Sequence, residues 1–267
     1  MNSISIKVNA KINLSLDITG VREDGYHLLD MLMTSVDIFD TITARKSDIP
    51  KVTMDGREVG GDNSAVKALK LLQDKFSIAM QVDVVKGIPF SAGMGGSSAD
   101  ASGVFYCASK LWNIAIEELI PLALKVGCDV PYMLFGGGAR VQGVGEIVTP
   151  VEVGHMTLVI AQKVIGSSTK DIYRKFDEVG GERDKSKTYF NVLERGAVML
   201  NPQIAEARAD LQKYANQVFM TGSGSAYVGV FDDEEKAKRC VESLKDYVFC
   251  KSAHTKPQGI EIIWQEQ

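Results

Sequence analysis

The N-terminal stretch of the chain alternates between apolar and polar residues over an unusual length. Over residues 3–18 every even position is apolar, and the odd positions are polar or charged. A period of two is typical of a β-strand, whose successive side chains point to opposite faces. We therefore expect one long strand with a buried apolar face. Lys11 and Asn13 share the other face about 7 Å apart, close enough to contact one ligand, whereas Lys7 and Asp17 are expected to face solvent.

Length and composition indicate a globular protein with no nucleic-acid or membrane partner. The 267 residues suffice for one large domain or two smaller ones, and 45% of them are hydrophobic. A net charge of −4 and a pI near 5.5 indicate no basic surface for nucleic-acid phosphates. No apolar run approaches the roughly 18 residues that span a bilayer, and the N-terminus lacks a secretion signal. The four cysteines show no C-x-x-C spacing and fit a reducing cytoplasm.

Residues 86–102, KGIPFSAGMGGSSADAS, follow an alternating apolar strand and lead into a helical run. Gly93, Gly95 and Gly96 are expected to adopt positive φ, so that backbone N–H groups can approach an anion. Ser97 and Ser98 are expected to cap the first turn of the helix, where the helix dipole adds positive charge. The stretch matches neither a Walker loop nor a dinucleotide fingerprint. A plain turn is the alternative, but the order of strand, glycines, serines and helix favours phosphate binding.

Two further segments carry residues with more than one possible role. The Asp24-Gly25 pair predicts a hairpin turn that presents Tyr26 and His27 near a loop tip, where they either stack on a base or simply pack. Asp129 follows a predicted helix over 116–126. It is either the N-cap of a short helix that begins at Val130 or a catalytic carboxylate.

The second half of the chain indicates a split β-α-β arrangement with a domain boundary between 154 and 155, which gives domains 1–154 and 155–267. We expect strands over 157–161, 218–220 and 227–231, helices over 168–176, 202–214 and 234–244, a polar loop over 177–187 and terminal strands. The turn that contains Gly222, Ser223 and Gly224 is either a tight connection or the far wall of an anion site between the domains.

Several of these segments together match one enzyme family. The chain resembles the GHMP superfamily of small-molecule kinases over nearly its whole length. The resemblance rests on residues 10–14 (AKINL), 24–27 (DGYH), 89–102, 127–131 (GCDVP), Ser168-Thr169 with Tyr173, and 221–224 (TGSG). Many relatives read Gly-Gly-Ser-Ser-Asp where this chain reads Gly-Ser-Ser-Ala-Asp at 96–100. This departure leaves open which loop serine contacts phosphate or magnesium.

The resemblance implies an α+β, two-domain GHMP kinase fold, with an N-terminal domain like ribosomal protein S5 domain 2 and a ferredoxin-like C-terminal domain. It implies Mg²⁺ and an ATP site formed by Pro89, Ala92, Gly93, Met94, Gly95, Gly96, Ser97 and Ser98. It implies Asp129 as the base with Lys11 assisting, and a substrate pocket that uses Asn13, Tyr26 and His27. We therefore expect Lys11 and Asp129 to approach within salt-bridge or single-water distance.

The expected activity is ATP-dependent phosphorylation of a hydroxyl on a small cytidylated polyol, because the segments AKINL and DGYH point to that branch of the superfamily. Two alternatives stay open at this point. The first alternative is a GHMP kinase of the homoserine or mevalonate type. The second is a non-catalytic module that binds nucleotide or RNA.

Overall fold

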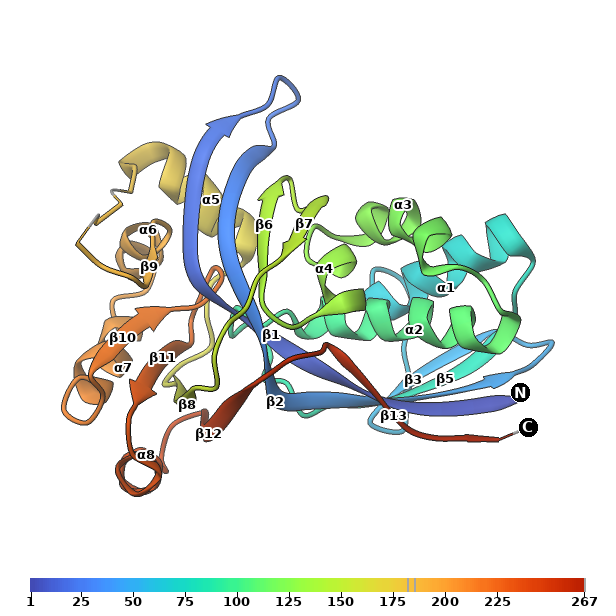
Figure 1. The fold of residues 1–267 in the computed structure, drawn as a ribbon. Helices are drawn as coiled ribbons and strands as arrows, with labels where there is room; N and C mark the ends of the chain where they lie inside the picture. The colour runs from blue at the N-terminus through green and yellow to red at the C-terminus, as the bar shows by residue number, and fades with distance from the viewer. Residues whose placement is uncertain (182, 185, 267) are drawn as a thin grey trace.

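Two long antiparallel strands organise the computed structural model, which describes residues 1–181, 183–184 and 186–266. These strands, β1 (Ser3–Val21) and β2 (His27–Lys46), run from the end of the molecule that carries both termini to a hairpin at the top of Figure 1, and they pair with strands of both halves. The even, apolar positions of β1 from Ile4 to Leu16 are buried, as the alternation predicts. The predicted hairpin turn joins the two strands, with Gly25 at a φ of 85°.

The polar face of β1 is covered as well. Lys11 and Asn13 are only 4% and 1% exposed. Lys7 and Asp17, expected to face solvent, are half-buried. The reason is tertiary: the Lys7 ammonium lies 4.4 Å from the centre of the Phe39 ring on β2, and Asp17 lies 3.7 Å from an Arg183 nitrogen. Residues distant in sequence pack against both faces of this strand, which no local pattern reveals.

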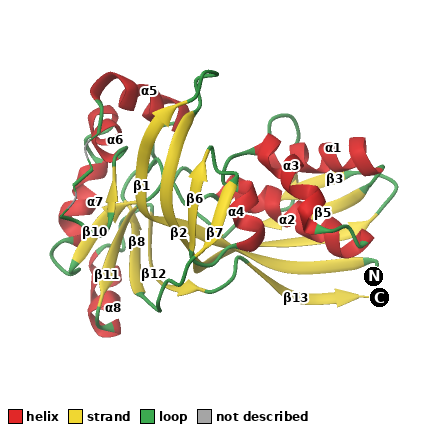
Figure 2. Cartoon of the chain, turned by 45° about the horizontal axis from the view of Figure 1, so that its top comes forward, coloured by secondary structure: helices red, strands yellow, loops and turns green. Residues whose placement is uncertain are grey.

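Helices cover one face of the sheet in the N-terminal half (Figure 2). The strands are β3 (Lys51–Met54), β4 (Arg57–Glu58), β5 (Met80–Val85), β6 (Ala139–Gly143) and β7 (Ile147–Pro150), and the helices are α1 (Ser64–Phe76), α2 (Gly96–Trp112), α3 (Ile116–Val126) and α4 (Val130–Phe135). Helix α2 packs directly on β2, because a Cβ added at Gly103 would lie 2.1 Å from Ile42 Cδ1. The glycine lets the helix approach the sheet closely and positions its N-terminus.

The C-terminal half forms an antiparallel sheet in the order β10-β11-β8-β12, which agrees with the expected split β-α-β arrangement. Its elements are β8 (Thr157–Gln162), α5 (Thr169–Val179), β9 (Phe190–Asn191), α6 (Glu194–Leu200), α7 (Ile204–Leu211), β10 (Gln217–Met220), β11 (Tyr227–Phe231), α8 (Glu234–Ser243), β12 (Phe249–Lys256) and β13 (Ile260–Glu266).

Two local expectations for this half are wrong, and two short elements were not predicted. The expected polar loop over 177–187 begins later, because α5 continues to Val179; residues 182 and 185 of that loop lie outside the described residues. Strand β9 and helix α6 occupy a stretch for which no element was predicted. Helix α7 starts at Ile204 rather than 202, because the side-chain oxygen of Asn201 accepts a 3.3 Å hydrogen bond from Gln203 N and forms a turn first.

The end of the chain returns to the N-terminal strands. Strand β13 pairs antiparallel with β1 over Ser3 to Val8, and the end of β12 pairs with β2 through Thr255 and Lys256. Figure 1 shows this return as the red strand beside the blue one. The predicted domain boundary between 154 and 155 stays a prediction. Residues 260–266, which it assigns to the second domain, form β13 on the sheet of residues 1–154.

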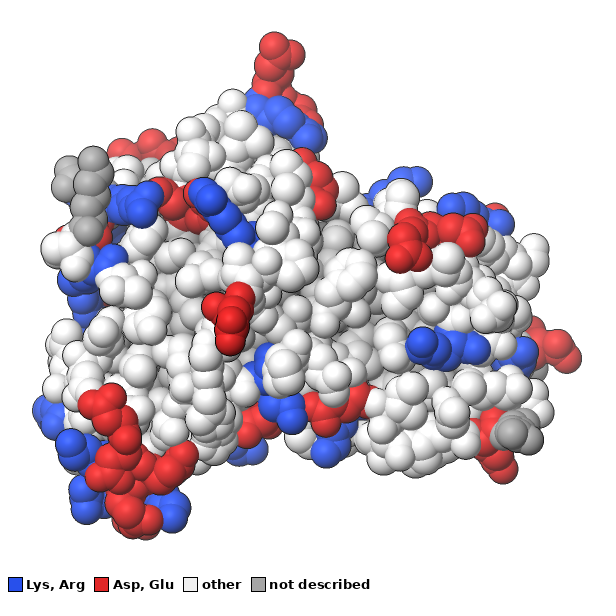
Figure 3. Space-filling view, in the orientation of Figure 1, with Lys and Arg blue, Asp and Glu red and all other residues white. Residues whose placement is uncertain are grey.

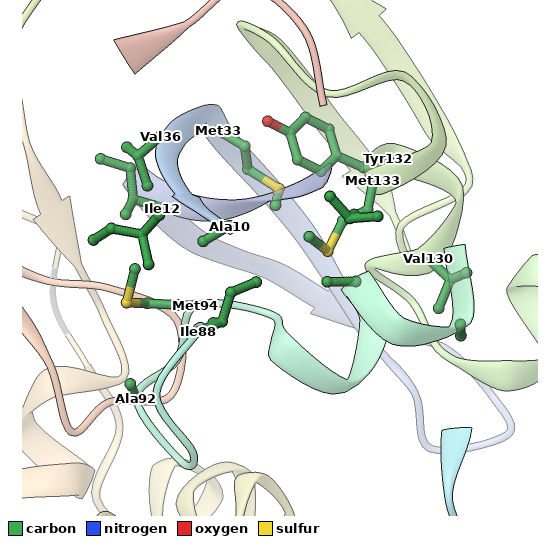
Figure 4. Packing of buried hydrophobic residues seen from close by; sticks show 14 of the residues in the cluster. Ala10, Ile12, Met33, Val36, Ile88, Ala92, Met94, Val130, Tyr132 and Met133 are labelled. Carbon is green, nitrogen blue, oxygen red and sulfur yellow. The ribbon is translucent and has the colours of Figure 1, made fainter. Parts of the chain in front are cut away.

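The glycine-rich loop is anchored by apolar side chains. Ile88, Ala92 and Met94 are 2%, 1% and 1% exposed. Figure 4 shows Ile88 and Met94 beside Ala10 and Ile12 of β1, with Ala92 farther along the loop. Because the apolar side chains of the loop pack toward β1, its backbone N–H groups and serine hydroxyls are available on the opposite side.

The outer surface carries charges of both signs. On the face shown in Figure 3, lysine and arginine side chains are interspersed with aspartate and glutamate, and acidic side chains gather over α8. Among the described helices, none has both the length and the apolar character that crossing a membrane requires.

Candidate active site

One cleft of about 1020 Å³ brings together the side chains and loops singled out in the sequence. It lies between the glycine-rich loop, the tip of the β1–β2 hairpin, the start of α5 and the turn after β10. The predicted residues that line it are Lys11, Asn13, Tyr26, His27, Pro89, Ala92, Gly93, Met94, Gly95, Gly96, Ser97, Ser98, Asp129, Gly222, Ser223 and Gly224. Its volume is at the upper end for small-molecule sites, as two ligands would require.

The backbone of the glycine-rich loop matches the expectation at two of its three glycines. Gly93 and Gly95 have φ values of 75° and 74°, in the left-handed region that favours glycine. The expectation is wrong for Gly96, which is the first residue of α2. At Gly93 an added Cβ would lie 2.1 Å from the carbonyl oxygen of Thr221, so this glycine also permits contact with the turn after β10.

The expectation that Ser97 and Ser98 cap α2 is also wrong. Gly95 is the N-cap residue and no side chain caps the helix, so the two serines lie within the first turn. The first intrahelical bond runs from Ala99 N to Gly95 O at 2.8 Å. The preceding N–H groups, at 96–98, therefore have no partner in the helix and lie at the cleft, as an anion site requires.

Lys11 and Asp129 meet beside this loop, as expected from the sequence. Lys11 Nζ lies 3.4 Å from Asp129 Oδ2, and the side chains are 5% and 27% exposed. The backbone N–H of Lys11 donates a 3.1 Å hydrogen bond to Met94 O, which ties the lysine to the loop. Asp129 is the N-cap residue of α4, but its side chain makes no capping hydrogen bond. Its carboxylate is therefore directed to the lysine, and the capping interpretation is wrong.

Asn13 connects this pair to the second half of the chain. Its Oδ1 accepts a 2.7 Å hydrogen bond from Lys11 Nζ and a 3.1 Å bond from Gly222 N. Its backbone N–H donates to Thr221 Oγ1 at 2.9 Å. Thr221 is fully buried. The sequence marks it only as part of a turn, because its partner is more than two hundred residues away.

The turn after β10 lies against the glycine-rich loop. Ser225 N donates to Ser91 O at 3.0 Å, and Ala226 N donates to Ala92 O at 3.3 Å. The hydroxyls of Ser223 and Thr169 are 3.0 Å apart. This turn therefore contributes to the cleft wall opposite α2. Its expected contact with an anion stays a prediction.

Tyr26 and His27 lie at the hairpin end of the cleft in different environments. Tyr26 is 55% exposed. His27 is held by α5: its Nε2 is 2.7 Å from Asp177 Oδ1, and its ring centre is 4.9 Å from that of Tyr173. Asp177 was expected in a loop. The period of 3.6 in α5 explains why it reaches the same histidine as Tyr173, four residues earlier.

Comparison with known proteins decides the family. Residues 63–137 match the family model for the GHMP kinases N terminal domain, and residues 176–249 match the model for GHMP kinases C terminal. A 4-diphosphocytidyl-2-C-methyl-D-erythritol kinase of Thermoanaerobacter pseudethanolicus is 36% identical, over 98% of this chain and 99% of its own length. The chain belongs to the GHMP kinase family. As a GHMP kinase it is an ATP-dependent small-molecule kinase, and its fold is the expected α+β, two-domain fold of that family.

Further relatives and solved structures are consistent with this family assignment. A protein of the same name from Clostridium botulinum is 35% identical, over 91% of this chain and 96% of its own length. A crystal structure of 4-(cytidine 5'-diphospho)-2C-methyl-D-erythritol kinase has a TM-score of 0.81 at 27% identity and covers 94% of this chain and 99% of that chain. Homoserine kinase from Cytophaga hutchinsonii has a TM-score of 0.71 at 18% identity, with 98% of both chains covered, a likeness of fold alone.

The GHMP kinase has a buried ionic cluster under its glycine-rich loop that the sequence did not reveal. Lys86 Nζ contacts Asp40 Oδ2 at 2.5 Å and both oxygens of Asp100 at 2.9 Å. Asp40 Oδ1 also accepts hydrogen bonds from the N–H groups of Gly87 and Ile88 at 2.7 and 2.9 Å. The cluster joins β2, the start of the loop and α2. Its members are 14 to 60 residues apart in the sequence, so no local motif signals it.

Burial affects the charge of this cluster. It raises the pKa of Asp100 to about 7, and the nearby Asp40 carboxylate acts in the same direction, whereas Lys86 lowers the pKa. Near neutral pH the Asp100 carboxyl is therefore partly protonated. The cluster of Lys86, Asp40 and Asp100 therefore holds the loop in place without two fully charged carboxylates in a buried site.

Proposed function

We propose that this GHMP kinase transfers the terminal phosphoryl group of ATP to the 2-hydroxyl of 4-diphosphocytidyl-2-C-methyl-D-erythritol, a step of non-mevalonate isoprenoid precursor synthesis. The names of the relatives support this substrate. The observation that carries the proposal is one cleft in which the ion pair of Lys11 and Asp129 lies 3.4 Å apart, beside a glycine-rich loop and with Tyr26 and His27 on the same lining. A small-molecule kinase needs these parts next to each other.

The proposed chemistry relies on positioning and charge. Phosphoryl transfer requires little covalent help from the protein, so alignment and stabilisation of charge dominate. Asp129 would accept the proton of the attacking hydroxyl, and Lys11 would stabilise the negative charge that develops there. The hydrogen bond from Lys11 to Asn13 orients the ammonium group. The free N–H groups of the first turn of α2 would hold phosphate oxygens.

The oxygen donors beside the loop fit Mg²⁺, which we include in the proposal. Within the described residues, no group of three or more His, Cys, Asp or Glu side chains has a geometry for holding a metal ion. Mg²⁺ in kinases is held largely by phosphate oxygens and water, with one or two protein ligands. Ser97 and Ser98 line the cleft and would supply those ligands through their hydroxyls. Bound Mg²⁺ neutralises phosphate charge.

The proposed cytidine pocket lies at the hairpin end of the cleft. Tyr26 is exposed enough to stack on a base, and His27 is held beside it by α5. Asn13 is expected to contact the polyol, although its Oδ1 already accepts bonds from Lys11 and Gly222. We propose that it also keeps Lys11 in position. A cytoplasmic location and the absence of a nucleic-acid partner stay predictions of the sequence.

A coupled assay of ADP release tests the substrate. The panel contains the cytidylated polyol, the same polyol without its cytidine diphosphate group, homoserine and mevalonate. We expect turnover of the first alone. Tyr26→Ala should raise KM for the cytidylated substrate about 10-fold or more, since base stacking is worth roughly 1–3 kcal/mol, and should leave KM for ATP nearly unchanged. Phosphorylation of the uncytidylated alcohols alone would refute the substrate and leave the family unaffected.

A further inference from the structure

One face of helix α5 holds the His27 ring. Tyr173, Phe176 and Asp177 are spaced i, i+3 and i+4, so they lie on the same side of the helix. The ring centre of His27 is 4.9 Å from that of Tyr173 and 6.2 Å from that of Phe176, the latter edge-on. The third contact is the hydrogen bond to Asp177 at 2.7 Å. Figure 1 shows α5 beside the upper part of β1, where the hairpin rises.

Asp177 acts on the cleft only through His27. The residues that line the cleft include His27 and Tyr173 but not Asp177. The side chain of His27 is 13% exposed and that of Asp177 is 54% exposed. The histidine therefore lies between the cleft and a carboxylate that is itself near solvent. This arrangement makes Asp177 a positioning residue, because it touches the ring and not the space where a ligand binds.

The hydrogen bond determines which ring nitrogen carries hydrogen. An ionised carboxylate only accepts hydrogen bonds, so His27 Nε2 must be the donor to Asp177 Oδ1. In the neutral ring the other nitrogen, Nδ1, is then an acceptor. Within the described residues, Nδ1 has no hydrogen-bond partner. It is the nitrogen that remains for a ligand.

We propose that Asp177 keeps His27 in the tautomer whose Nδ1 accepts a hydrogen bond, and that this selects a pyrimidine with an amino group over one with a carbonyl at the same position. The inference rests on the proposed function, in which His27 faces the base. The 4-amino group of cytosine donates a hydrogen bond to such an acceptor. The 4-carbonyl of uracil would place one acceptor against another, which leaves both groups without a partner.

The tautomer can be measured without any substrate. Two-dimensional ¹⁵N NMR on protein labelled in its three histidines distinguishes the two neutral tautomers by their nitrogen shifts, and a His27→Gln variant assigns the signal. We expect the Nε2–H form in the wild type and a mixture of the two forms in Asp177→Ala. A wild-type spectrum of the Nδ1–H form would overturn the inference, whatever the substrate of the enzyme.

Selectivity is measured as the inhibition constant of UDP divided by that of CDP, both determined against turnover of the cytidylated substrate. The wild type should bind CDP at least about 10-fold more tightly. Asp177→Asn can donate its amide N–H to Nε2 and turn Nδ1 into a donor, so the ratio should fall about 10-fold. Asp177→Ala should lower the selectivity ratio too. In this variant the KM of the substrate and the inhibition constant of CDP should rise while kcat changes little.

Glu178→Gln is the matched control. Glu178 is the next residue on α5 and pairs with Lys175 rather than His27, so this variant should keep the wild-type ratio. If Asp177→Asn and Asp177→Ala both retain the wild-type ratio of the UDP inhibition constant to that of CDP, the inference is wrong and the proposed function stands. A wild type that does not turn over the cytidylated polyol instead refutes the proposed function, a result that needs no variant.

Discussion

Asp129 is the residue on which the proposed chemistry depends most directly. Its carboxylate pairs with Lys11 and makes no capping hydrogen bond with α4. Asp129→Asn keeps the size of the side chain and removes only its basicity. We expect kcat to fall roughly 10²–10⁴-fold, as for loss of a positioned general base, with little change in the melting temperature or in KM for ATP. Lys11→Met should also depress kcat. Normal turnover by the asparagine variant would exclude Asp129 as the base.

Gly95 and Gly96 are adjacent in the sequence, but the structure predicts different tolerance to substitution. Gly95 has a φ of 74°, and a Cβ there would lie 3.1 Å from Lys11 Cγ. Gly96 is helical, and its added Cβ would lie 3.3 Å from Ile88 Cγ2, a side-chain contact that a small shift relieves. We expect Gly95→Ala to weaken ATP binding at least about 10-fold, because φ > 0 costs an L-residue roughly 1–2 kcal/mol and the loop must move.

Titration calorimetry with a non-hydrolysable ATP analogue checks this difference, with Gly96→Ala as the control. The control should bind within about 3-fold of the wild type, since alanine also favours the helix by roughly 1 kcal/mol. Equal losses in both variants would mean that the left-handed conformation of Gly95 is not what the site requires.

At the scale of elements, the cluster of Lys86, Asp40 and Asp100 joins β2, the loop and α2. Lys86→Met leaves two buried carboxylates without their cation, so we expect a loss of about 3–5 kcal/mol in the free energy of unfolding. Chemical denaturation measures it. Lys70→Met, at an exposed position of α1, is the control and should change stability little. A wild-type midpoint in Lys86→Met would mean that the cluster does not hold these elements together.

The same cluster predicts a pH dependence. The pKa of Asp100 is about 7 in the folded protein, above the ordinary value of 3.8, because the site is buried. A raised pKa means that the folded state holds a proton that the unfolded chain has lost. This contribution to stability is complete below pH 3.8 and disappears as the pH rises through about 7. Asp100→Asn should remove that fall from a plot of stability against pH.

At the scale of the whole molecule, His254 connects the two halves. Its Nδ1 lies 3.0 Å from Asp37 Oδ2 on β2, and its Nε2 lies 2.8 Å from Glu234 Oε1 on α8. The hydrogen bonds to Glu234 and Asp37 raise the pKa of His254 above its ordinary 6.5. The stabilisation is therefore complete below pH 6.5 and is lost as the pH rises through the folded-state pKa.

Thermal unfolding between pH 6 and 9 tests this connection. The wild type should lose stability as the pH rises, and Glu234→Gln should reduce that loss because it removes the first of the two carboxylates. Glu235→Gln is the control, because Glu235 pairs with Lys238 instead. A pH profile that Glu234→Gln leaves unchanged would mean that the histidine does not stabilise the junction.

The sequence by itself determined the local features of this protein. Alternation over residues 3–18 predicted the long strand β1, and the order of strand, glycines and helix predicted the loop of the cleft. These features depend on neighbouring residues, whose periodicity and backbone freedom are properties of the local chain. The resemblance to the GHMP kinases, rather than periodicity, named most of the cleft residues from Lys11 to Gly224, because the motifs of the family are short and contiguous.

Only the tertiary structure decided which distant groups meet. The partner of His27 is Asp177, the partners of Lys86 are Asp40 and Asp100, and Thr221 bonds to Asn13. The partners in these pairs are too far apart in the sequence for the periodicity of one helix or strand to relate them. The residues around Asp129 left open whether it caps a helix, and its approach to Lys11 was expected only together with the family resemblance. The choice depends on where Lys11 lies after β1 has packed against the glycine-rich loop, and that position results from burial of both faces of the strand.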